Sequence, residues 1–201
     1  MRRGILFILS GPSGSGKDTI LKILLEKHPE IKLSVSMTTR EIRANETADV
    51  SYYFVSRQEF ENSINNGDFL EYAIFDGEYY GTPKKKIESY LEKGIDVILE
   101  IEVQGAMQVL EKAKDAVTIM ITPPDIQILE KWLRGRGMNS EDSINKRLAT
   151  AREEIKYLPK YNYSVINEEN KQEECAELIY SIMQAEHHKT VHTDSIMSKF
   201  E

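Results

Sequence analysis

Residues 10–19, SGPSGSGKDT, have the composition and spacing of a loop that binds phosphate. Gly11, Gly16 and Lys17 match the pattern GxxxxGK, and the loop lies between an apolar run and an amphipathic segment. In that context the glycines let successive N–H groups point inward, while the helix N-terminus and the lysine supply positive charge. We therefore predict a site for the phosphates of a nucleotide. The alternative is a glycine-rich turn without a ligand.

Oxygen-bearing side chains near this loop suggest where a metal ion would bind. Asp18 follows the lysine, where a hydroxyl that reaches magnesium is usual, and Thr19 comes one residue later. Glu100 and Glu102, in the segment LEIE, share one face at the end of a predicted strand, the edge where α/β sheets bind ligands. We expect Asp18, Thr19 and Glu100 to hold Mg²⁺ mainly through water. The alternative is that the two glutamates form a buried scaffold pair against Arg40.

Two arginines indicate a second site for an anion. Arg40 and Arg43 follow a segment rich in hydroxyl groups, SVSMTT. Guanidinium groups bind phosphate oxygens in a bidentate manner, so this pair predicts a site for a second phosphate group. The alternative is a pair of solvated arginines with no ligand.

Apolar runs that alternate with longer amphipathic segments predict the fold class. The runs occupy residues 5–9, 33–37, 96–102, 116–121 and 163–167. Strands of this kind, separated by helices, are typical of an α/β fold with a parallel sheet covered on both faces.

Residues 37–86 interrupt this alternation and predict a small α+β insert. Ser56 and Glu59 form a capping-box pattern at the start of a helix, and the pair Asp76-Gly77 is typical of a hairpin turn. Thr82 and Pro83 fit the N-cap and the first position of the next helix.

Length, charge and cysteine content limit the classes of protein to consider. The 201 residues suit one domain with lobes, and the net charge of -7 argues against binding nucleic acid through a basic surface. The apolar run at 5–9 is too short for a signal peptide or a membrane span. Cys175 is the only cysteine, so no internal disulfide can form. We predict a cytoplasmic protein that binds neither nucleic acid nor membrane; its oligomeric state stays open.

From about residue 4 to residue 186 the sequence resembles the guanylate kinase family. The matching motifs are the phosphate loop, SVSxTTRxxR, YYFVS, GDFLEYAxFxGxYYGT, ILEIEVQGA, GRG, SINKRLATA and VINE. The resemblance implies a P-loop core of three α/β/α layers and transfer of the γ-phosphoryl group of ATP to GMP, and to dGMP, with Mg²⁺. It implies a domain over 1–186, followed by a tail over 187–201. Within the domain we expect a core at about 1–36, 87–133 and 158–186, a GMP-binding lobe at 37–86 and a lid at 134–157.

The resemblance also implies roles for particular residues. The ATP site would comprise Gly11, Pro12, Ser13, Gly14, Ser15, Gly16, Lys17, Asp18, Thr19, Arg136 and Asn167. The GMP site would comprise Ser36, Arg40, Arg43, Tyr52 and Tyr80 at the phosphate, Glu71 and Thr82 at the guanine, and Glu100 and Glu102. Catalysis would fall to Lys17, Arg40, Arg136 and Arg147. Chemistry independently supports Glu71, because guanine presents two adjacent N–H donors that suit a carboxylate.

Three departures from the family pattern leave alternatives open. Asp18 replaces a hydroxyl, Trp132 stands where an arginine is usual, and residues 42–51 lack the usual proline and glycine. A further difference is Glu102, which stands where the family most often has aspartate. One alternative is a related kinase with another phosphate acceptor. The other is a module that binds GMP or a phosphopeptide and performs no chemistry.

Overall fold

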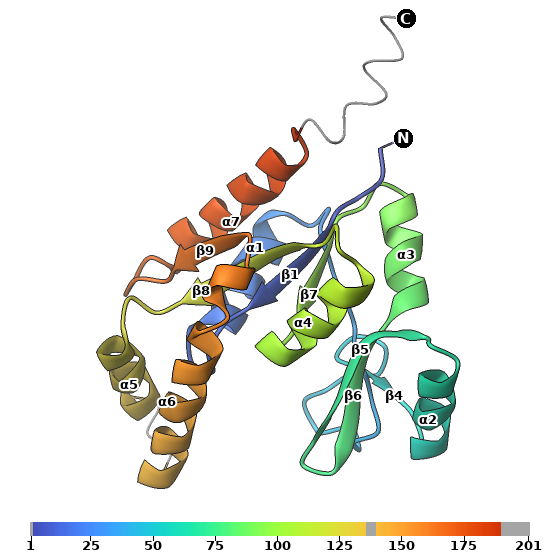
Figure 1. Cartoon of the computed structure of the whole chain (residues 1–201), viewed down its shortest axis with the longest axis horizontal. Helices are drawn as coiled ribbons and strands as arrows, with labels where there is room; N and C mark the ends of the chain where they lie inside the picture. Colours follow the sequence, from blue (N-terminus) through green and yellow to red (C-terminus); the bar gives the residue numbers. More distant parts are fainter. Residues whose placement is uncertain (1, 136–139, 190–201) are drawn as a thin grey trace, which may run out of the picture. The chain divides into compact units, whose positions relative to one another are not determined.

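Two units make up the fold of residues 2–135 and 140–189, the part of the chain that the computed structural model describes (Figure 1). The first unit contains residues 1–10 and 29–118, and the second contains residues 11–28 and 119–201. Each unit is therefore built from two separate stretches of the chain. None of the helices in the described part is long and apolar enough to cross a membrane.

A parallel layer forms one part of the first unit. Its strands are ordered β2-β7-β1, with the bounds β1 Leu6–Ser10, β2 Lys32–Leu33 and β7 Val97–Glu100. The register pairs Leu6 with Val97 and Leu9 with Glu100. All five residues of β1 are buried, as expected for a strand covered on both faces. Two helices contact this layer: α3 (Lys84–Glu92) lies against β7 and α4 (Val103–Lys112) lies against β1.

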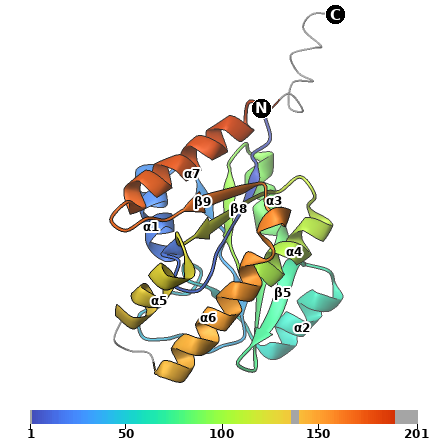
Figure 2. The same cartoon turned by 60° about the vertical axis from the view of Figure 1, so that its left-hand side comes forward.

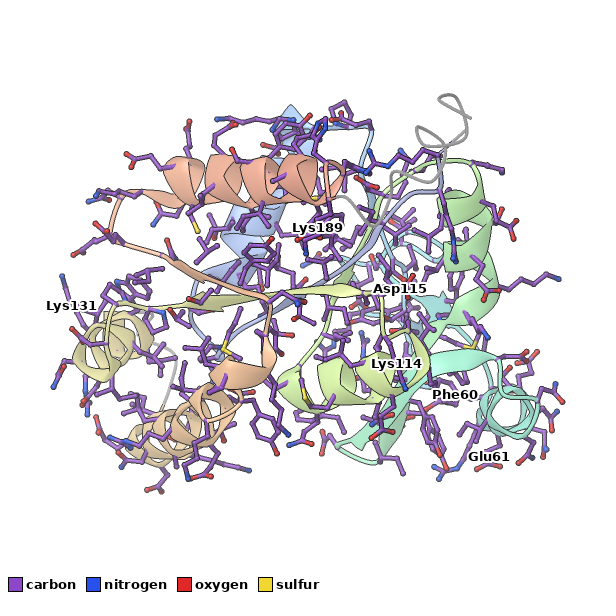
Figure 3. The ribbon with its side chains drawn as sticks, turned by 45° about the horizontal axis from the view of Figure 1, so that its top comes forward. Phe60, Glu61, Lys114, Asp115, Lys131 and Lys189 are labelled. Atoms are coloured by element: carbon purple, nitrogen blue, oxygen red, sulfur yellow. The ribbon has the colours of Figure 1, made fainter. Side chains whose placement is uncertain are left out.

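A second, four-stranded sheet forms the predicted insert in the same unit. Its order is β4-β3-β6-β5, with the bounds β3 Met37–Thr38, β4 Tyr53–Phe54, β5 Phe69–Phe75 and β6 Glu78–Pro83. Helix α2 (Arg57–Asn65) packs on it through Phe60, whose ring stacks on Phe69 at 4.5 Å and on Tyr79 at 5.0 Å (Figure 3).

Two local predictions in this insert are confirmed. Ser56 caps α2, and Glu59 completes the capping box by accepting from the Ser56 N–H at 2.8 Å. Asp76 and Gly77 both have positive φ, 52° and 82°, as a tight hairpin turn between β5 and β6 requires.

Several element boundaries differ from the sequence prediction. Strand β7 ends at Glu100, so Glu102, which was predicted on the same face of that strand, is instead the N-cap of α4. Residues 33–37 do not form one strand, because the chain leaves β2 after Leu33 and joins the other sheet at β3. Thr82 is not an N-cap: it is the penultimate residue of β6, and Pro83 is the N-cap of α3. The physical reason is that the Thr82 hydroxyl donates to Glu71 instead of bonding to the helix amides.

In the described residues, the second unit combines a pair of parallel strands with helices. Strand β8 (Val117–Thr122, of which the unit contains residues from 119 on) pairs with β9 (Tyr163–Ile166), with Ile119 opposite Tyr163. Helices α1 (Lys17–Lys27) and α7 (Gln172–Glu186) lie side by side (Figures 1 and 2). Helices α5 (Ile126–Gly135) and α6 (Glu141–Ile155) share a buried apolar cluster, and a short 3-10 helix (Leu158–Lys160) leads to β9.

Candidate functional site

A pocket of about 410 Å³ lies in the first unit and brings most of the predicted acceptor residues together. We call it the first pocket. Of the residues predicted from the sequence it is lined by Ser36, Arg40, Arg43, Tyr52, Glu71, Tyr80, Glu100 and Glu102. Residues that the sequence reasoning did not select also line it, and they include Glu46, Phe75, Gln104 and Gly105.

Arg40 is the most constrained cation of the first pocket. Its two terminal nitrogens donate to the two carboxylate oxygens of Glu46 at 2.7 and 3.0 Å, and its Nε donates to the Tyr80 hydroxyl at 3.2 Å. The rings of Tyr52 and Phe54 lie 5.5 and 5.8 Å from the guanidinium carbon. The guanidinium is thus held in one plane, with its orientation fixed before any ligand binds.

Glu46 organises this corner of the pocket, and the sequence analysis missed it. It also accepts a hydrogen bond from the backbone N–H of Arg43 at 2.9 Å. The bonds from Arg40, together with that amide, lower the pKa of Glu46 to about 2, so its carboxylate is charged at any working pH. Glu102 is exposed and Glu100 is half-buried, so the two glutamates do not form the buried pair that was one alternative. The only sequence signal for Glu46 is an acidic residue three positions after Arg43 in a polar loop.

Glu71 is the buried carboxylate of the first pocket. Its side chain accepts a hydrogen bond from the Thr82 hydroxyl at 2.5 Å, and the residue is 7% exposed. Burial raises the pKa of Glu71, while the Thr82 hydroxyl and the Lys112 ammonium act in the opposite direction. A Cβ at Gly105 would lie 3.2 Å from the second oxygen of Glu71, so a glycine there leaves that oxygen uncrowded. Thr82 thus acts on the pocket through Glu71.

The predicted phosphate loop lies in the second unit and has the backbone that such a loop needs. Gly14 and Gly16 have φ of 96° and 86°, and Gly16 is the N-cap of α1. A Cβ at Gly16 would approach the Asn167 side-chain nitrogen to 2.3 Å, so only glycine fits. Asn167 is 2% exposed, and its amide donates to the Ser15 carbonyl at 2.8 Å. The loop conformation is therefore fixed from β9 as well as by its own glycines.

A pocket of about 440 Å³ opens beside this loop, and we call it the second pocket. It is lined by Gly14, Gly16, Thr19, Lys131, Trp132, Gly135, Asn167, Glu169 and Gln172. The pocket therefore brings together four residues predicted for the ATP site, Gly14, Gly16, Thr19 and Asn167. Lys131, Trp132, Glu169 and Gln172 were not predicted as binding residues, because a helix surface and a polar loop give no sequence signal for a pocket.

Comparison with known proteins identifies the family of this chain. The family model for guanylate kinase matches residues 3–186 of this chain. The chain belongs to the guanylate kinase family. The guanylate kinase of Clostridium perfringens (strain SM101 / Type A) is 47% identical over 184 residues, which cover 92% of this chain and 84% of that protein. The guanylate kinase of Clostridioides difficile (strain 630) is 44% identical over 202 residues, which cover 100% and 98%.

A solved member of the family supports the fold. The crystal structure of guanylate kinase from Anaplasma phagocytophilum matches with a TM-score of 0.73 at 35% identity, covering 94% of this chain and 89% of that one. The predicted α/β fold with parallel strands and flanking helices is confirmed, as is the resemblance to the guanylate kinase family.

The remaining residues predicted for the ATP site and for catalysis differ in exposure, and one of them lies outside the described residues. Ser13 and Asp18 are exposed, and the Asp18 carboxylate lies 4.0 Å from the Lys17 ammonium. Arg147 lies on α6 and is half-buried, whereas Arg136 lies outside the described residues. Arg134 is bound on both sides, to Glu130 at 2.8 Å and to Glu141 at 2.5 Å.

Proposed function

We propose that this chain transfers the γ-phosphoryl group of ATP to GMP, with the first pocket as the GMP site and the second pocket as the start of the ATP site. Membership of the guanylate kinase family supports the reaction. The observation that carries the site assignment is the composition of the first pocket. It joins a fixed arginine fork, Arg40, to a buried carboxylate, Glu71, which are the two groups that a guanine nucleotide monophosphate requires.

In the first pocket the phosphate would bind at Arg40, Arg43, Tyr52 and Tyr80, with Ser36 close by. The second pKa of a phosphate monoester is near 6, so the acceptor oxygen is mostly ionised at neutral pH and needs no general base. Catalysis then consists of alignment and charge neutralisation. Arg40 suits alignment because its plane is fixed by Glu46 and Tyr80 in the absence of ligand.

The guanine would bind at Glu71. Guanine N1–H and N2–H₂ are adjacent donors, whereas adenine has no amino group at C2 and has a lone pair at N1. Thr82 donates to Glu71 and leaves acceptor capacity on the carboxylate for the base. A site built in this way discriminates by leaving its buried carboxylate unpaired when the wrong base enters. The same contacts are available to dGMP, since none of them involves the ribose.

In the second unit the loop amides of residues 11–16 and the Lys17 ammonium would hold the β- and γ-phosphate oxygens of ATP. Lys17 begins α1, where the helix dipole adds positive potential, and its side chain is 16% exposed. These groups are fixed before the reaction, so they can stabilise the charge that develops on the transferred group without rearranging.

Magnesium is the cofactor expected of this family, and the residues present fit it. Thr19 lines the second pocket and the Asp18 carboxylate is 91% exposed in the first turn of α1, so both can reach a hydrated ion that arrives with the nucleotide. Glu100, the third residue predicted at the metal, ends strand β7 in the first unit. When bound, the ion would neutralise charge on the β- and γ-phosphate oxygens.

The division of the chain into a core, a GMP-binding lobe at 37–86 and a lid at 134–157 is part of the same proposal. The separate sheet β4-β3-β6-β5 with α2 supports the lobe. In the lid, Arg147 on α6 would contact the ATP phosphates and help to exclude water, which limits hydrolysis. The same role is predicted for Arg136, which lies outside the described residues.

Steady-state formation of ADP from Mg-ATP tests the function. With GMP, dGMP, AMP, CMP and UMP as acceptors, we expect turnover with GMP and dGMP and values of kcat/KM for the other three that are lower by on the order of 10³-fold or more. Turnover with a different acceptor alone would favour a related kinase. Binding of GMP without any affinity for Mg-ATP would favour the non-catalytic module; the retained Lys17 and phosphate loop argue against that class.

Replacing Glu46 with glutamine should weaken GMP binding. Glutamine keeps the shape but loses the charge that fixes Arg40 and the backbone of Arg43, so we expect KM for GMP to rise about tenfold and kcat to change less. Glu61→Gln, at an exposed ion pair on α2, is the matched control and should leave KM unchanged. An unchanged KM for GMP in Glu46→Gln would show that Arg40 needs no such support.

The same substitution has a pH signature. The pKa of Glu46 is lowered to about 2 in the folded chain, so its ionised form stabilises the fold above the ordinary carboxyl pKa of about 4.5. That contribution is lost as the pH falls through 2. The difference in free energy of unfolding between parent and Glu46→Gln should therefore shrink between about pH 4.5 and 2, which acid titrations of both proteins would measure.

A further inference from the structure

Trp132 forms part of the wall of the second pocket, and the proposed reaction does not yet use it. The position of its helix is fixed next to the phosphate loop. A Cβ at Gly14 would lie 2.8 Å from the Leu133 side chain and 3.3 Å from that of Leu129, so α5 packs directly on the loop. Leu129 and Leu133 are buried in the cluster shared with α6, whereas Trp132 is half-buried and faces the pocket.

The chemistry of the pocket wall around Trp132 is suited to an aromatic ligand rather than to more phosphate. An indole carries no charge and has a single N–H donor, so it cannot neutralise a phosphate. The neighbouring cation, Lys131, donates to both carboxylate oxygens of Glu169, at 2.9 and 3.0 Å. The pocket volume, about 440 Å³, is in the range of sites that hold small organic ligands.

We propose that Trp132 stacks on the purine ring of the phosphate donor and is a binding residue of the second pocket. This inference rests on the proposed function, because it assigns the second pocket to ATP. Gly14, Gly16 and Thr19 of the loop region line the same pocket as Trp132. A nucleotide whose phosphates bind at the loop would therefore have the flat face of the indole available for its base. Stacking uses the π-face that every base has, so this contact favours any purine nucleoside triphosphate over a bare polyphosphate.

The chain itself provides the optical probe, because Trp132 is its only tryptophan. Titration of the full chain with Mg-ATP should change the intrinsic fluorescence in a saturable way. Tripolyphosphate with Mg²⁺, which has phosphates and no base, should compete with ATP for binding yet leave the fluorescence nearly unchanged. An equal fluorescence change with tripolyphosphate would overturn the proposal, since it would mean that the indole reports loop occupancy and not base contact.

Two substitutions supply a second, independent measurement. In Trp132→Leu the dissociation constant of ATP, measured by calorimetry, should rise about tenfold, whereas that of tripolyphosphate should stay within about twofold. In Trp132→Phe a smaller aromatic face remains, so the ATP affinity should lie between those of parent and Trp132→Leu. KM for ATP should follow the same order, and KM for GMP should not change.

The outcomes separate this inference from the proposed function. If the parent chain phosphorylates GMP and Trp132→Leu binds ATP as tightly as the parent, the stacking proposal is wrong and the kinase function stands. Equal weakening of ATP and tripolyphosphate binding in Trp132→Leu would also overturn it, because the indole would then be supporting the loop. If the parent binds no nucleoside triphosphate at all, both the function and the inference fail.

Discussion

Replacing Lys17 with alanine is expected to lower kcat for GMP phosphorylation by on the order of 10³-fold or more. The ammonium is a full charge at the start of α1, and in the proposed function it would stabilise the negative charge that develops on the phosphate oxygens during transfer. KM for GMP should change little, because Lys17 and the first pocket belong to different units. Steady-state kinetics with saturating Mg-ATP and varied GMP would measure both parameters.

The control for this substitution lies on the same helix. Lys22 lies five residues after Lys17, is 76% exposed on its side chain and pairs with Glu26 four residues later. Lys22→Ala therefore removes an equal charge from the solvent-exposed side of α1. We expect Lys22→Ala to keep the parental kcat. A Lys17→Ala protein that retained more than about a tenth of the parental kcat would contradict a direct role of the ammonium in transfer.

The second large effect is expected at Glu71. In Glu71→Gln one carboxylate oxygen becomes an N–H₂ donor that faces the donors of guanine, so kcat/KM for GMP should fall by about 10³-fold. Selectivity for GMP over AMP should also fall. The value of kcat/KM for AMP should decrease far less, because N1 of adenine can accept a hydrogen bond from the new amide. The assay is the acceptor panel described above, run on parent and variant. Glu88→Gln, at an exposed pair with Lys84 on α3, is the matched control.

Stability distinguishes a binding role of Glu71 from a structural one. Burial raises the pKa of Glu71, so its ionised form costs the fold free energy above that pKa, and the cost is relieved as the pH falls through it. Glutamine carries no such cost, and its carbonyl can still accept from Thr82. Glu71→Gln should therefore unfold at a temperature no lower than the parent at neutral pH. A marked loss of thermal stability would indicate that the carboxylate holds β5 and β6 together.

The raised pKa of Glu71 also predicts a pH dependence of binding. The proposed recognition of guanine needs the ionised carboxylate. As the pH is lowered, KM for GMP should therefore begin to rise at a pH above the ordinary carboxyl pKa of about 4.5. The ionisation of GMP itself affects parent and variant alike. The additional dependence should be absent in Glu71→Gln.

Much of the fold could be predicted because its signals are local. Buried strands such as β1, the capping box at Ser56 and the Asp76-Gly77 turn are each specified by neighbouring residues, and each is confirmed. The predictions that were wrong concern residues whose conformation depends on a partner distant in sequence. Thr82 has the sequence of an N-cap, yet Glu71 takes its hydroxyl.

Residues of the candidate site could be predicted only where they belong to a recognisable sequence motif. Arg40 and Glu71 belong to recognisable segments and do line one pocket. Glu46 and Gly105 act through contacts made after folding, a bidentate pair and a close approach, and neither contact leaves a pattern in the sequence. The roles assigned to individual residues, the lid at 134–157 and the cytoplasmic location stay predictions.

The hydrogen bond from Asn167 to the Ser15 carbonyl joins residues that are 152 positions apart, and this separation matters during synthesis. At 5–20 residues per second a ribosome needs roughly 8 to 30 s to produce Asn167 after Ser15. Throughout that interval the nascent phosphate loop lacks the hydrogen bond from the Asn167 amide. It also lacks the part of the second-pocket wall that follows β9, which includes Asn167 and Glu169. We therefore expect cellular ATP to stabilise only chains extended past this residue, and prematurely terminated products to gain no protection from proteolysis by nucleotide.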